Sequence, residues 1–503
     1  MPPIRRKDRP LRPFEQYRRS LGDADRALLD AFLAAADEHA ALPRRDMAAL
    51  RADFENALLF YAGTELPLAE ALARLDVRHL GGFYLRPPVL WYPLDDAAKI
   101  YPLSMKHGRM SVFRLSVYLK EPVVPALLQM ALNFTIKRFP SFATTVKKGF
   151  FWHYLDACKR RYEIEPEGGL PCQPLRVARS GSQSFRLLHH ENRISVEYFH
   201  ILTDGSGGTV FLKTLAAEYL RLLGHPIPGG EGVLSIDDAP AESETANEFS
   251  RADRSRGAAG FLDKAALQLG GRPSRTRPCR VLHFKMDAER LLSAAKARET
   301  TITAYLLSRM FVACRCATDE PAGELSIQVP VNMRKFYPSD TLRNFALYCG
   351  VRLPIRALGD ADGILGEISR QLAEKGSREA MSDMMCATER MVRALRYVPL
   401  FIKAPVARLV YGFLGEGVFS NTLSNLGRVA MPEAMAAHVE SMDFVLGTAP
   451  GNRAGCALIT LGSAATLSIS KNTADPSFEE KLLELLEADG LDIRVEGSAL
   501  YAD

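Results

Sequence analysis

A long segment rich in glycine, proline, serine and acidic residues divides the chain near its middle and constrains the fold more than any other feature. It spans residues 226–278 and begins PIPGGEGVLSIDDAPAESETANEF. This composition is typical of a connection and not of a buried strand or helix. The chain has 503 residues, which is too long for one ordinary hydrophobic core. We therefore expect two lobes joined by a crossover linker.

Strand-like and helix-like stretches alternate on both sides of this linker. Before it, SVFRLSVYL, SFRLLHH and ISVEYFH predict strands, and ENR predicts the turn of a hairpin formed by the last two. After it, further strands are predicted at CRVLHFKM, LSIQVPV, LRNFALYCGVRLPI, SMDFVLG, GCALITLGS and ATLSISKN. The expected fold class is α/β (α+β), with an N-terminal lobe over residues 83–225 and a C-terminal lobe over residues 279–503.

Residues 1–82 have a different composition, which is rich in alanine, leucine and arginine. Stretches such as DMAALRADFENALLFYAG have helical periodicity. They predict a helical N-terminal extension packed on the main body. A docking module for a partner protein is the alternative.

Composition and charge argue against several classes of protein. Hydrophobic residues make up 47% and charged residues 24%, as in soluble globular proteins. The net charge of +5 is too weak to indicate a nucleic-acid partner. No run of 18 apolar residues occurs, so no transmembrane segment is expected. The basic N-terminus has no apolar stretch behind it, which predicts no secretory signal.

The eight cysteines are scattered and lack metal-type spacing. They predict reduced thiols and a cytoplasmic location. No metal is expected at the histidines either. His189 and His190 lie beside the predicted hairpin turn, and His200 ends the second strand. At about 3.3 Å per residue, this separates them by more than roughly 10 Å.

The stretch VEYFHILTDGSGG carries the candidate chemistry. Strand alternation places His200 on the same face as Val196 and Tyr198. A histidine in this position can act as a general base near neutral pH. The glycines after Asp204 would let a substrate approach the backbone closely. The alternative is a hydrogen-bonded core histidine, with Asp204 as the N-cap of the next helix.

HILTDG resembles the HxxxDG motif of the chloramphenicol acetyltransferase-like superfamily, which includes condensation domains of peptide synthetases and alcohol acetyltransferases. PVNMRKFYPSDTLRNF, SNTLSNLG and WYPLDDAAKIYPLS resemble segments of bacterial proteins related to alcohol acetyltransferases. The resemblance covers roughly Leu90 to Asp489. Many relatives carry a second histidine where this chain has Phe199, which argues mildly against the peptide-synthetase branch. The resemblance implies two lobes in a V around a central channel.

By the same resemblance, His200 deprotonates an acceptor that attacks a thioester carbonyl, and Asp204 and Gly205 complete the catalytic motif. Asp204 would pair with Arg334 of the second lobe and support the shape of the site. Ser424 and Asn425 would supply polar groups to the channel wall or to the oxyanion. The alternative for SNLG is a structural turn, in which Asn425 and Gly427 adopt unusual backbone angles.

The resemblance favours an O-acyltransferase that moves an acyl group, expected to be acetyl, from a coenzyme A thioester to an alcohol. Acyl-CoA would be a co-substrate, and no permanently bound cofactor is expected. Two alternatives remain. One is an enzyme that takes its acyl group from an acyl carrier protein. The other is a non-catalytic binding module, against which the intact His200, Asp204 and Gly205 argue.

Overall fold

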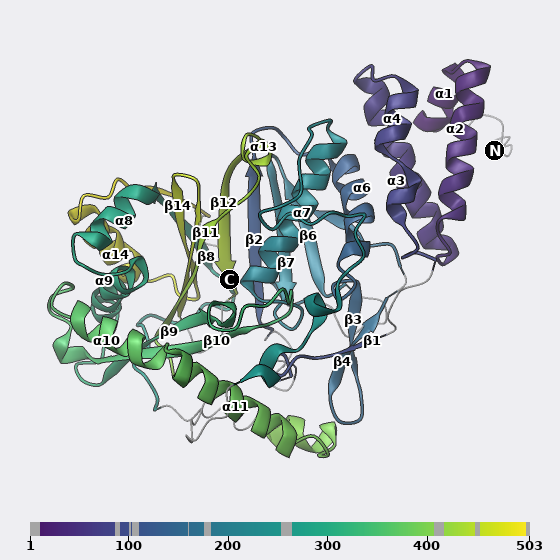
Figure 1. The fold of residues 1–503 in the computed structure, drawn as a ribbon. Helices are drawn as coiled ribbons and strands as arrows, with labels where there is room; N and C mark the ends of the chain where they lie inside the picture. Colours follow the sequence, from purple (N-terminus) through teal and green to yellow (C-terminus); the bar gives the residue numbers. More distant parts are fainter. Residues whose placement is uncertain are drawn as a thin grey trace, which may run out of the picture.

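The computed structural model describes residues 11–85, 91–99, 102, 110–158, 160–175, 183–252, 264–406, 417–447 and 453–498. The described strands form three sheets flanked by helices, which confirms the mixed α/β class (Figure 1). The elements up to the linker are α1 (Pro13–Ser20), α2 (Asp23–Glu38), α3 (Arg44–Gly63), α4 (Leu68–Arg74), η1 (Val77–Leu80), β1 (Trp91–Pro93), β2 (Val112–Leu119), α6 (Pro125–Thr135), η2 (Ile136–Arg138), β3 (Thr144–Lys148), β4 (His153–Ala157), β5 (Ile164–Pro166), β6 (Phe185–His190), β7 (Arg193–Phe199) and α7 (Gly205–Leu222).

The described parts of the linker, residues 226–252 and 264–278, contain two short 3-10 helices, η3 (Glu242–Thr245) and η4 (Glu248–Arg251). The elements after the linker are β8 (Arg280–Asp287), α8 (Ala288–Lys296), α9 (Ile302–Cys316), β9 (Glu324–Asn332), η5 (Met333–Lys335), β10 (Ala346–Pro354), η6 (Ile355–Ala357), α10 (Leu365–Lys375), α11 (Arg378–Ala394), β11 (Asn421–Val429), α13 (Glu433–Ala436), β12 (Val439–Leu446), β13 (Ala454–Leu461), β14 (Ala464–Lys471), α14 (Ser477–Ala488) and β15 (Arg494–Gly497).

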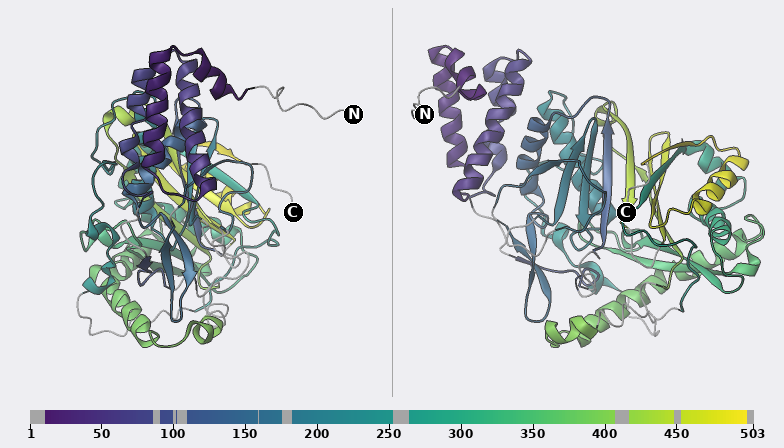
Figure 2. Two further views of the ribbon diagram at one scale, coloured as in Figure 1. Left: turned by 90° about the vertical axis from the view of Figure 1, so that its right-hand side faces the viewer. Right: turned by 180° about the vertical axis from the view of Figure 1, so that it is seen from behind.

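Helices α1 to α4 form a bundle that projects from one end of the molecule (Figure 2). The bundle shares a continuous hydrophobic core with the first lobe, and Phe54 of α3 packs against Phe134 of α6 with ring centroids 6.4 Å apart. The Tyr61 hydroxyl also donates to the Leu222 carbonyl at 2.6 Å, at the end of α7. Apolar packing and this buried hydrogen bond therefore hold the bundle on the lobe.

The predicted hairpin is present as β6 and β7, which pair antiparallel from Phe185 opposite Tyr198 to His190 opposite Arg193. These strands belong to a five-stranded sheet with the order β12-β2-β7-β6-β5. Helices α6 and α7 contribute to the same hydrophobic core as β2 and β7. The side chains of Val196 and Tyr198 on β7 are fully buried in this core. Helix α7 ends at Leu222, and Gly224 follows with a φ of +101°, as its C-terminal position requires.

One strand of this sheet comes from the other half of the chain. Strand β12 pairs antiparallel with β2, with Val445 opposite Arg114. The C-terminal half thus completes the sheet of the N-terminal half, a crossing that a division at residues 226–278 does not predict. The boundaries 1–82, 83–225, 226–278 and 279–503 stay predictions.

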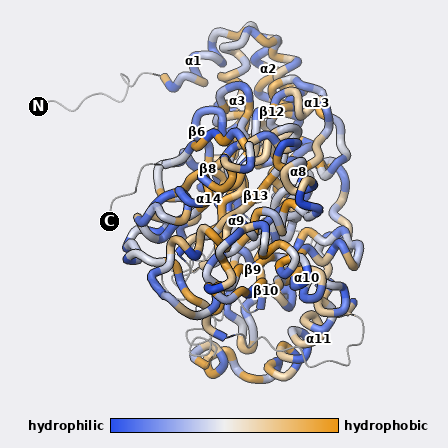
Figure 3. The backbone as a smooth tube through the Cα atoms, turned by 90° about the vertical axis from the view of Figure 1, so that its left-hand side faces the viewer, coloured by the Kyte–Doolittle hydropathy of each residue, from blue (hydrophilic) through white to orange (hydrophobic). Residues whose placement is uncertain are grey.

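The second half builds a seven-stranded sheet with the order β10-β9-β11-β13-β14-β8-β15. Its inner strands, such as β9 and β13, consist largely of apolar residues, whereas the outer loops are largely hydrophilic (Figure 3). Within the described residues, no helix is both long enough and apolar enough to cross a membrane. The eight cysteines all lie in described segments, and none of them is in a disulfide.

Candidate active site

His200 lies one residue beyond the end of β7, in the turn that leads to α7. Its backbone N–H donates to the Ser111 carbonyl at 2.8 Å, which anchors the turn to the start of β2. Its ring meets the Phe113 ring edge-on, with centroids 5.1 Å apart. The imidazole is half-buried, as expected for a histidine at the end of a buried strand.

The second lobe provides the partner of the imidazole. His200 Nδ1 lies 2.9 Å from Asn344 Oδ1, and Asn344 Nδ2 donates to Asp95 Oδ2 at 3.4 Å. Because a carboxylate accepts from the amide nitrogen, the amide oxygen of Asn344 faces the histidine. That oxygen accepts a hydrogen bond from Nδ1–H. The neutral imidazole is thereby held in the tautomer whose lone pair is on Nε2.

Asp95 supports this arrangement from a fully buried position. One carboxylate oxygen accepts from the Ala98 N–H at 2.7 Å, and the other lies 3.6 Å from Nε of Arg343. Burial raises the pKa of Asp95, although the Arg343 guanidinium opposes the rise. Asn344 and Asp95 were not among the residues expected at this site. Both lie in stretches that carry the resemblance, but nothing local marks either side chain as a partner of His200.

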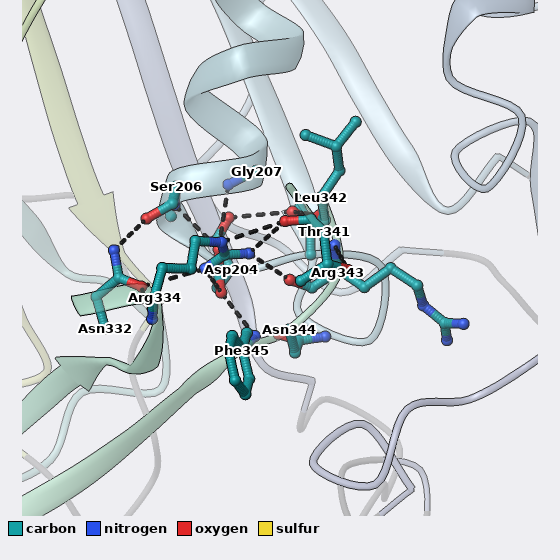
Figure 4. Close-up of polar contacts among 12 residues, drawn as sticks. Asp204, Ser206, Gly207, Asn332, Arg334, Thr341, Leu342, Arg343, Asn344 and Phe345 are labelled. Atoms are coloured by element: carbon teal, nitrogen blue, oxygen red, sulfur yellow. Dashed lines mark hydrogen bonds and ion pairs between the residues drawn. The ribbon is translucent and has the colours of Figure 1, made fainter. Parts of the chain in front are cut away.

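Asp204 uses its carboxylate in two ways at once (Figure 4). Oδ1 accepts from the backbone N–H groups of Ser206 and Gly207, both at 3.1 Å, which makes Asp204 the N-cap of α7. Oδ2 accepts from Arg334 Nη1 at 2.7 Å and from the Phe345 N–H at 2.8 Å. The expected contact with Arg334 is therefore present together with the capping role. The group that orients His200 is Asn344, and Asp204 instead joins the two lobes.

Arg334 holds the segment that carries Asn344. Its guanidinium donates to the Thr341 carbonyl at 2.7 Å and to the Arg343 carbonyl at 2.8 Å. On the other side, the Thr203 hydroxyl donates to the Leu342 carbonyl at 2.6 Å. The predicted strand LRNFALYCGVRLPI consequently begins only at Ala346, where β10 starts. Residues 342–345 bond to the motif and to Arg334 instead of joining the strand ladder.

At two of the motif glycines, protein atoms occupy the place that a side chain would take. A β-carbon at Gly205 would lie 2.5 Å from the Leu426 side chain, and one at Gly207 would lie 2.1 Å from the Leu342 carbonyl oxygen. Protein atoms fill the space beside both glycines. These positions require glycine because the second lobe packs directly on the start of α7.

The SNLG segment lies within β11 and reaches the motif through Leu426. Gly427 has a φ of +72°, and the parallel register with β13 shifts between Asn425 and Arg428. Asn425 Oδ1 accepts from the Gly427 N–H at 2.8 Å, and its Nδ2 donates to Thr303 Oγ1 at 3.1 Å. These contacts belong to an irregularity within the strand, where Gly427 has a positive φ. An oxyanion role for Ser424 or Asn425 stays a prediction.

Within the segments that the structure describes, no cluster of three or more His, Cys, Asp or Glu side chains is arranged to hold a metal ion. The contacts with Asn344 and Phe113 fix the orientation of the His200 imidazole. It lies at the junction of two lobes that are bonded together through Asp204 and Arg334. Such an imidazole can accept a proton at Nε2.

Comparison with solved structures identifies similar folds. Polyketide synthase associated protein 5 from Mycobacterium tuberculosis matches with a TM-score of 0.52 and 11% identity, over 80% of this chain and 98% of its own. The TRI3 trichothecene 15-O-acetyltransferase from Fusarium sporotrichioides matches with a TM-score of 0.52 and 13% identity, over 79% and 94%. The first condensation domain of the CDA synthetase matches with a TM-score of 0.51 and 15% identity, over 80% and 94%.

No family model matches the sequence, and no curated protein matches it. At identities of 11 to 15%, the structural matches show the fold alone. They cover about four fifths of the chain and nearly the whole of each similar chain.

Proposed function

Because this chain has the chloramphenicol acetyltransferase-like fold, in common with an O-acetyltransferase and a condensation domain, we propose that it transfers an acyl group from a thioester to an alcohol. His200 acts as the general base. Coenzyme A is the proposed carrier of the acyl group and acetyl the proposed group. The protein is then an enzyme without a resident cofactor.

The observation that carries the proposal is the contact between His200 Nδ1 and Asn344 Oδ1 at 2.9 Å. A base must present a lone pair in a fixed direction, and this contact assigns the lone pair to Nε2. The side chain behind it, Asp95, is fully buried and bonded to Asn344. The arrangement is therefore preorganised before any substrate binds.

The proposed reaction is a direct transfer. His200 Nε2 takes the hydroxyl proton of the acceptor while the acceptor oxygen attacks the thioester carbonyl carbon. The tetrahedral intermediate then collapses and its C–S bond breaks. The leaving thiolate takes the proton from the imidazolium, so the products are an ester and a free thiol. Asn344 Oδ1 keeps its hydrogen bond to Nδ1–H throughout and stabilises the transient positive charge.

The test measures release of free thiol from acetyl-CoA and from longer acyl-CoAs against a panel of small and lipid alcohols. We expect acceptor-dependent release by the wild-type protein, and a loss of roughly 100-fold or more in His200→Ala. His190→Ala is the matched control, because it removes an exposed histidine beside the hairpin turn. Full activity in His200→Ala would contradict the assignment of the base.

Two other readings make different predictions in the same experiment. If the donor is a carrier-protein thioester, acyl-CoAs release no thiol and an acylated carrier protein does, still dependent on His200. If the protein is a binding module, neither donor is turned over in the presence of any acceptor. Equilibrium binding of acyl-CoA without turnover would then support the hypothesis of a binding module.

A further inference from the structure

Exposed aromatic side chains gather on two segments that lie next to each other. Phe150 is 66% exposed, and Tyr397 and Phe401 are each 70% exposed. We define the apolar patch as these three residues together with three further exposed side chains: Phe151, Ile402 and Val406. An exposed cluster of large apolar side chains indicates a binding surface, whereas single exposed ones do not.

Direct contacts join the two segments that carry the patch. The Phe150 and Phe151 rings are 4.8 Å apart, and the Phe151 and Tyr397 rings are 6.3 Å apart. The Leu400 N–H donates to the Phe150 carbonyl at 2.8 Å, which ties residues 399–406 to the tip of the β3–β4 hairpin. The hairpin tip and the end of α11 project together at the end of the molecule opposite the α1–α4 bundle (Figures 1 and 2).

Cations lie on the same two segments. Residues 147–153 and 389–406 contain six lysines and arginines and a single carboxylate, Glu389. Lys148, Arg390, Arg393 and Arg396 are exposed, and Glu389 pairs with Arg393. Lys403 is buried instead and lies over the Trp152 ring at 3.2 Å. Lys147 pairs with Asp156, so four exposed cations, of which Arg393 is paired, lie on the two segments that carry the patch.

We propose that the apolar patch docks this protein on an anionic lipid bilayer. Aromatic rings on a protruding tip can enter the headgroup region, while lysine and arginine side chains attract anionic headgroups. The inference goes beyond the acyl-transfer proposal and does not depend on it.

The shape of the patch favours a bilayer over a protein partner. Protein interfaces concentrate their binding energy in aromatic side chains that fill pockets. Here the rings stand on a hairpin tip and on the segment after α11, where they are more than one third exposed. A bilayer accepts such protruding rings without a matching pocket, and its anionic headgroups attract the exposed cations at the same time.

The two tryptophans of the chain provide a probe that needs no mutation. Trp152 lies at the base of the patch under Lys403, and Trp91 is on β1, which pairs with β4. We would add vesicles of phosphatidylcholine, with or without 30% phosphatidylserine, to the full chain. Tryptophan emission should shift to shorter wavelength, and the protein should float with the vesicles that contain phosphatidylserine. An unchanged emission spectrum without flotation would overturn the proposal.

Paired variants separate the apolar and cationic contributions. Phe150→Ser with Phe401→Ser should lower vesicle binding by roughly tenfold or more, because the inserted rings are lost. Leu28→Ser with Val495→Ser is the control, since it removes two side chains that are 46% and 45% exposed elsewhere.

Lys148→Ser with Arg396→Ser should also lower binding roughly tenfold. Arg290→Ser with Lys296→Ser removes the same charge from exposed positions on α8 and should leave binding unchanged. Equal binding by each patch variant and its control would overturn the proposal. Light scattering provides a further test. If the wild-type protein were a dimer and Phe150→Ser with Phe401→Ser made it a monomer, the patch would be a contact between two copies of this chain, and the proposal would be overturned. Binding of an acidic carrier protein, without vesicle binding, would overturn it as well.

Discussion

At the scale of single residues, the orientation of His200 depends on an amide from the other half of the chain. Asn344 can bond to His200 in only one direction, because its amide nitrogen donates to the buried Asp95. An asparagine in this position sets the tautomer without adding a charge beside the imidazole. In the proposed transfer, the imidazolium would give up its proton to the leaving thiolate more readily than it would beside a carboxylate.

Asn344→Ala should lower kcat by about 10- to 100-fold while leaving KM nearly unchanged, because the imidazole loses its orientation and not its binding contacts. Asn344→Asp combined with Asp95→Asn should keep the hydrogen bonds to both neighbours and move the acidic limb of the kcat/KM profile to higher pH, because a carboxylate beside Nδ1 stabilises the imidazolium. Steady-state kinetics between pH 5 and 9 measure both effects. If both variants had a lowered kcat and the pH profile of the wild-type protein, the role of Asn344 would be purely structural.

The contact between Asp204 and Arg334 should be coupled in a double-mutant cycle. Arg334→Met leaves the buried Asp204 carboxylate without its partner, which costs about 3 kcal/mol in free energy of unfolding, and Asp204→Asn leaves the partly buried Arg334 guanidinium without its own, which should cost less. The double variant leaves neither charge, so its loss should be smaller than the sum by about 1–3 kcal/mol. Denaturant unfolding of the four proteins gives the coupling. Additive losses would mean that the two side chains stabilise the protein independently.

At the scale of elements, the first turn of α7 is the surface on which the two lobes meet. Its N-cap is Asp204, its third residue, Gly207, touches the Leu342 carbonyl, and Ser206 accepts from Asn332 at 3.1 Å. The helix therefore positions His200 and the Asn344 segment relative to each other. At Gly207 the neighbouring atom is a backbone carbonyl oxygen, which leaves little room for relaxation after a substitution there.

Gly207→Ala should destabilise the protein by about 2–3 kcal/mol, because the added methyl group would overlap the Leu342 carbonyl oxygen. Gly366→Ala in α10 is the matched control, since a β-carbon there meets nothing within 4 Å. The control should stabilise the protein by about 0.5–1 kcal/mol through helix propensity. The midpoints of urea unfolding compare the two. A wild-type midpoint in Gly207→Ala would show that residues 342–345 can move away from α7.

At the scale of the whole molecule, β12 brings a polar layer between the two large sheets. Asp443 of β12 accepts from the Tyr118 hydroxyl at 2.7 Å, and its carboxylate lies 3.9 Å from Nε2 of His283 on β8. His283 Nδ1 lies 2.9 Å from Ser468 Oγ on β14. Burial lowers the pKa of His283 below its usual value, and nearby Lys285 and Arg193 add to this, although Asp443 and Glu496 oppose it.

The lowered pKa of His283 makes the stability of the fold depend on pH. The unfolded chain binds a proton at this side chain near pH 6.5, whereas the folded chain does so only at lower pH. The contribution to stability is therefore complete above about pH 7 and is lost as the pH falls through 6.5 toward the folded pKa. His283→Gln should flatten the decline of unfolding free energy between pH 7 and 5. An unchanged slope would mean that His283 does not titrate differently in the two states.

The sequence by itself determined the local features of this protein. Strand alternation and turn residues predicted the β6–β7 hairpin, and the order of Asp204 and the glycines predicted the start of α7, because these features depend on neighbours a few residues apart. The HxxxDG resemblance led to the fold and to the Asp204 contact with Arg334.

Only the tertiary structure decided which distant side chains meet. Asn344 is 144 residues from His200, and the Leu342 carbonyl lies against Gly207. No sequence pattern in residues 342–344 indicates that they contact His200 or Gly207. The same holds for β12. Its sequence predicts a strand, but not that this strand pairs with β2 of the N-terminal half. Packing of the two lobes selects these contacts, because the strand pairing and side-chain fit that favour them exist only once both lobes are in place.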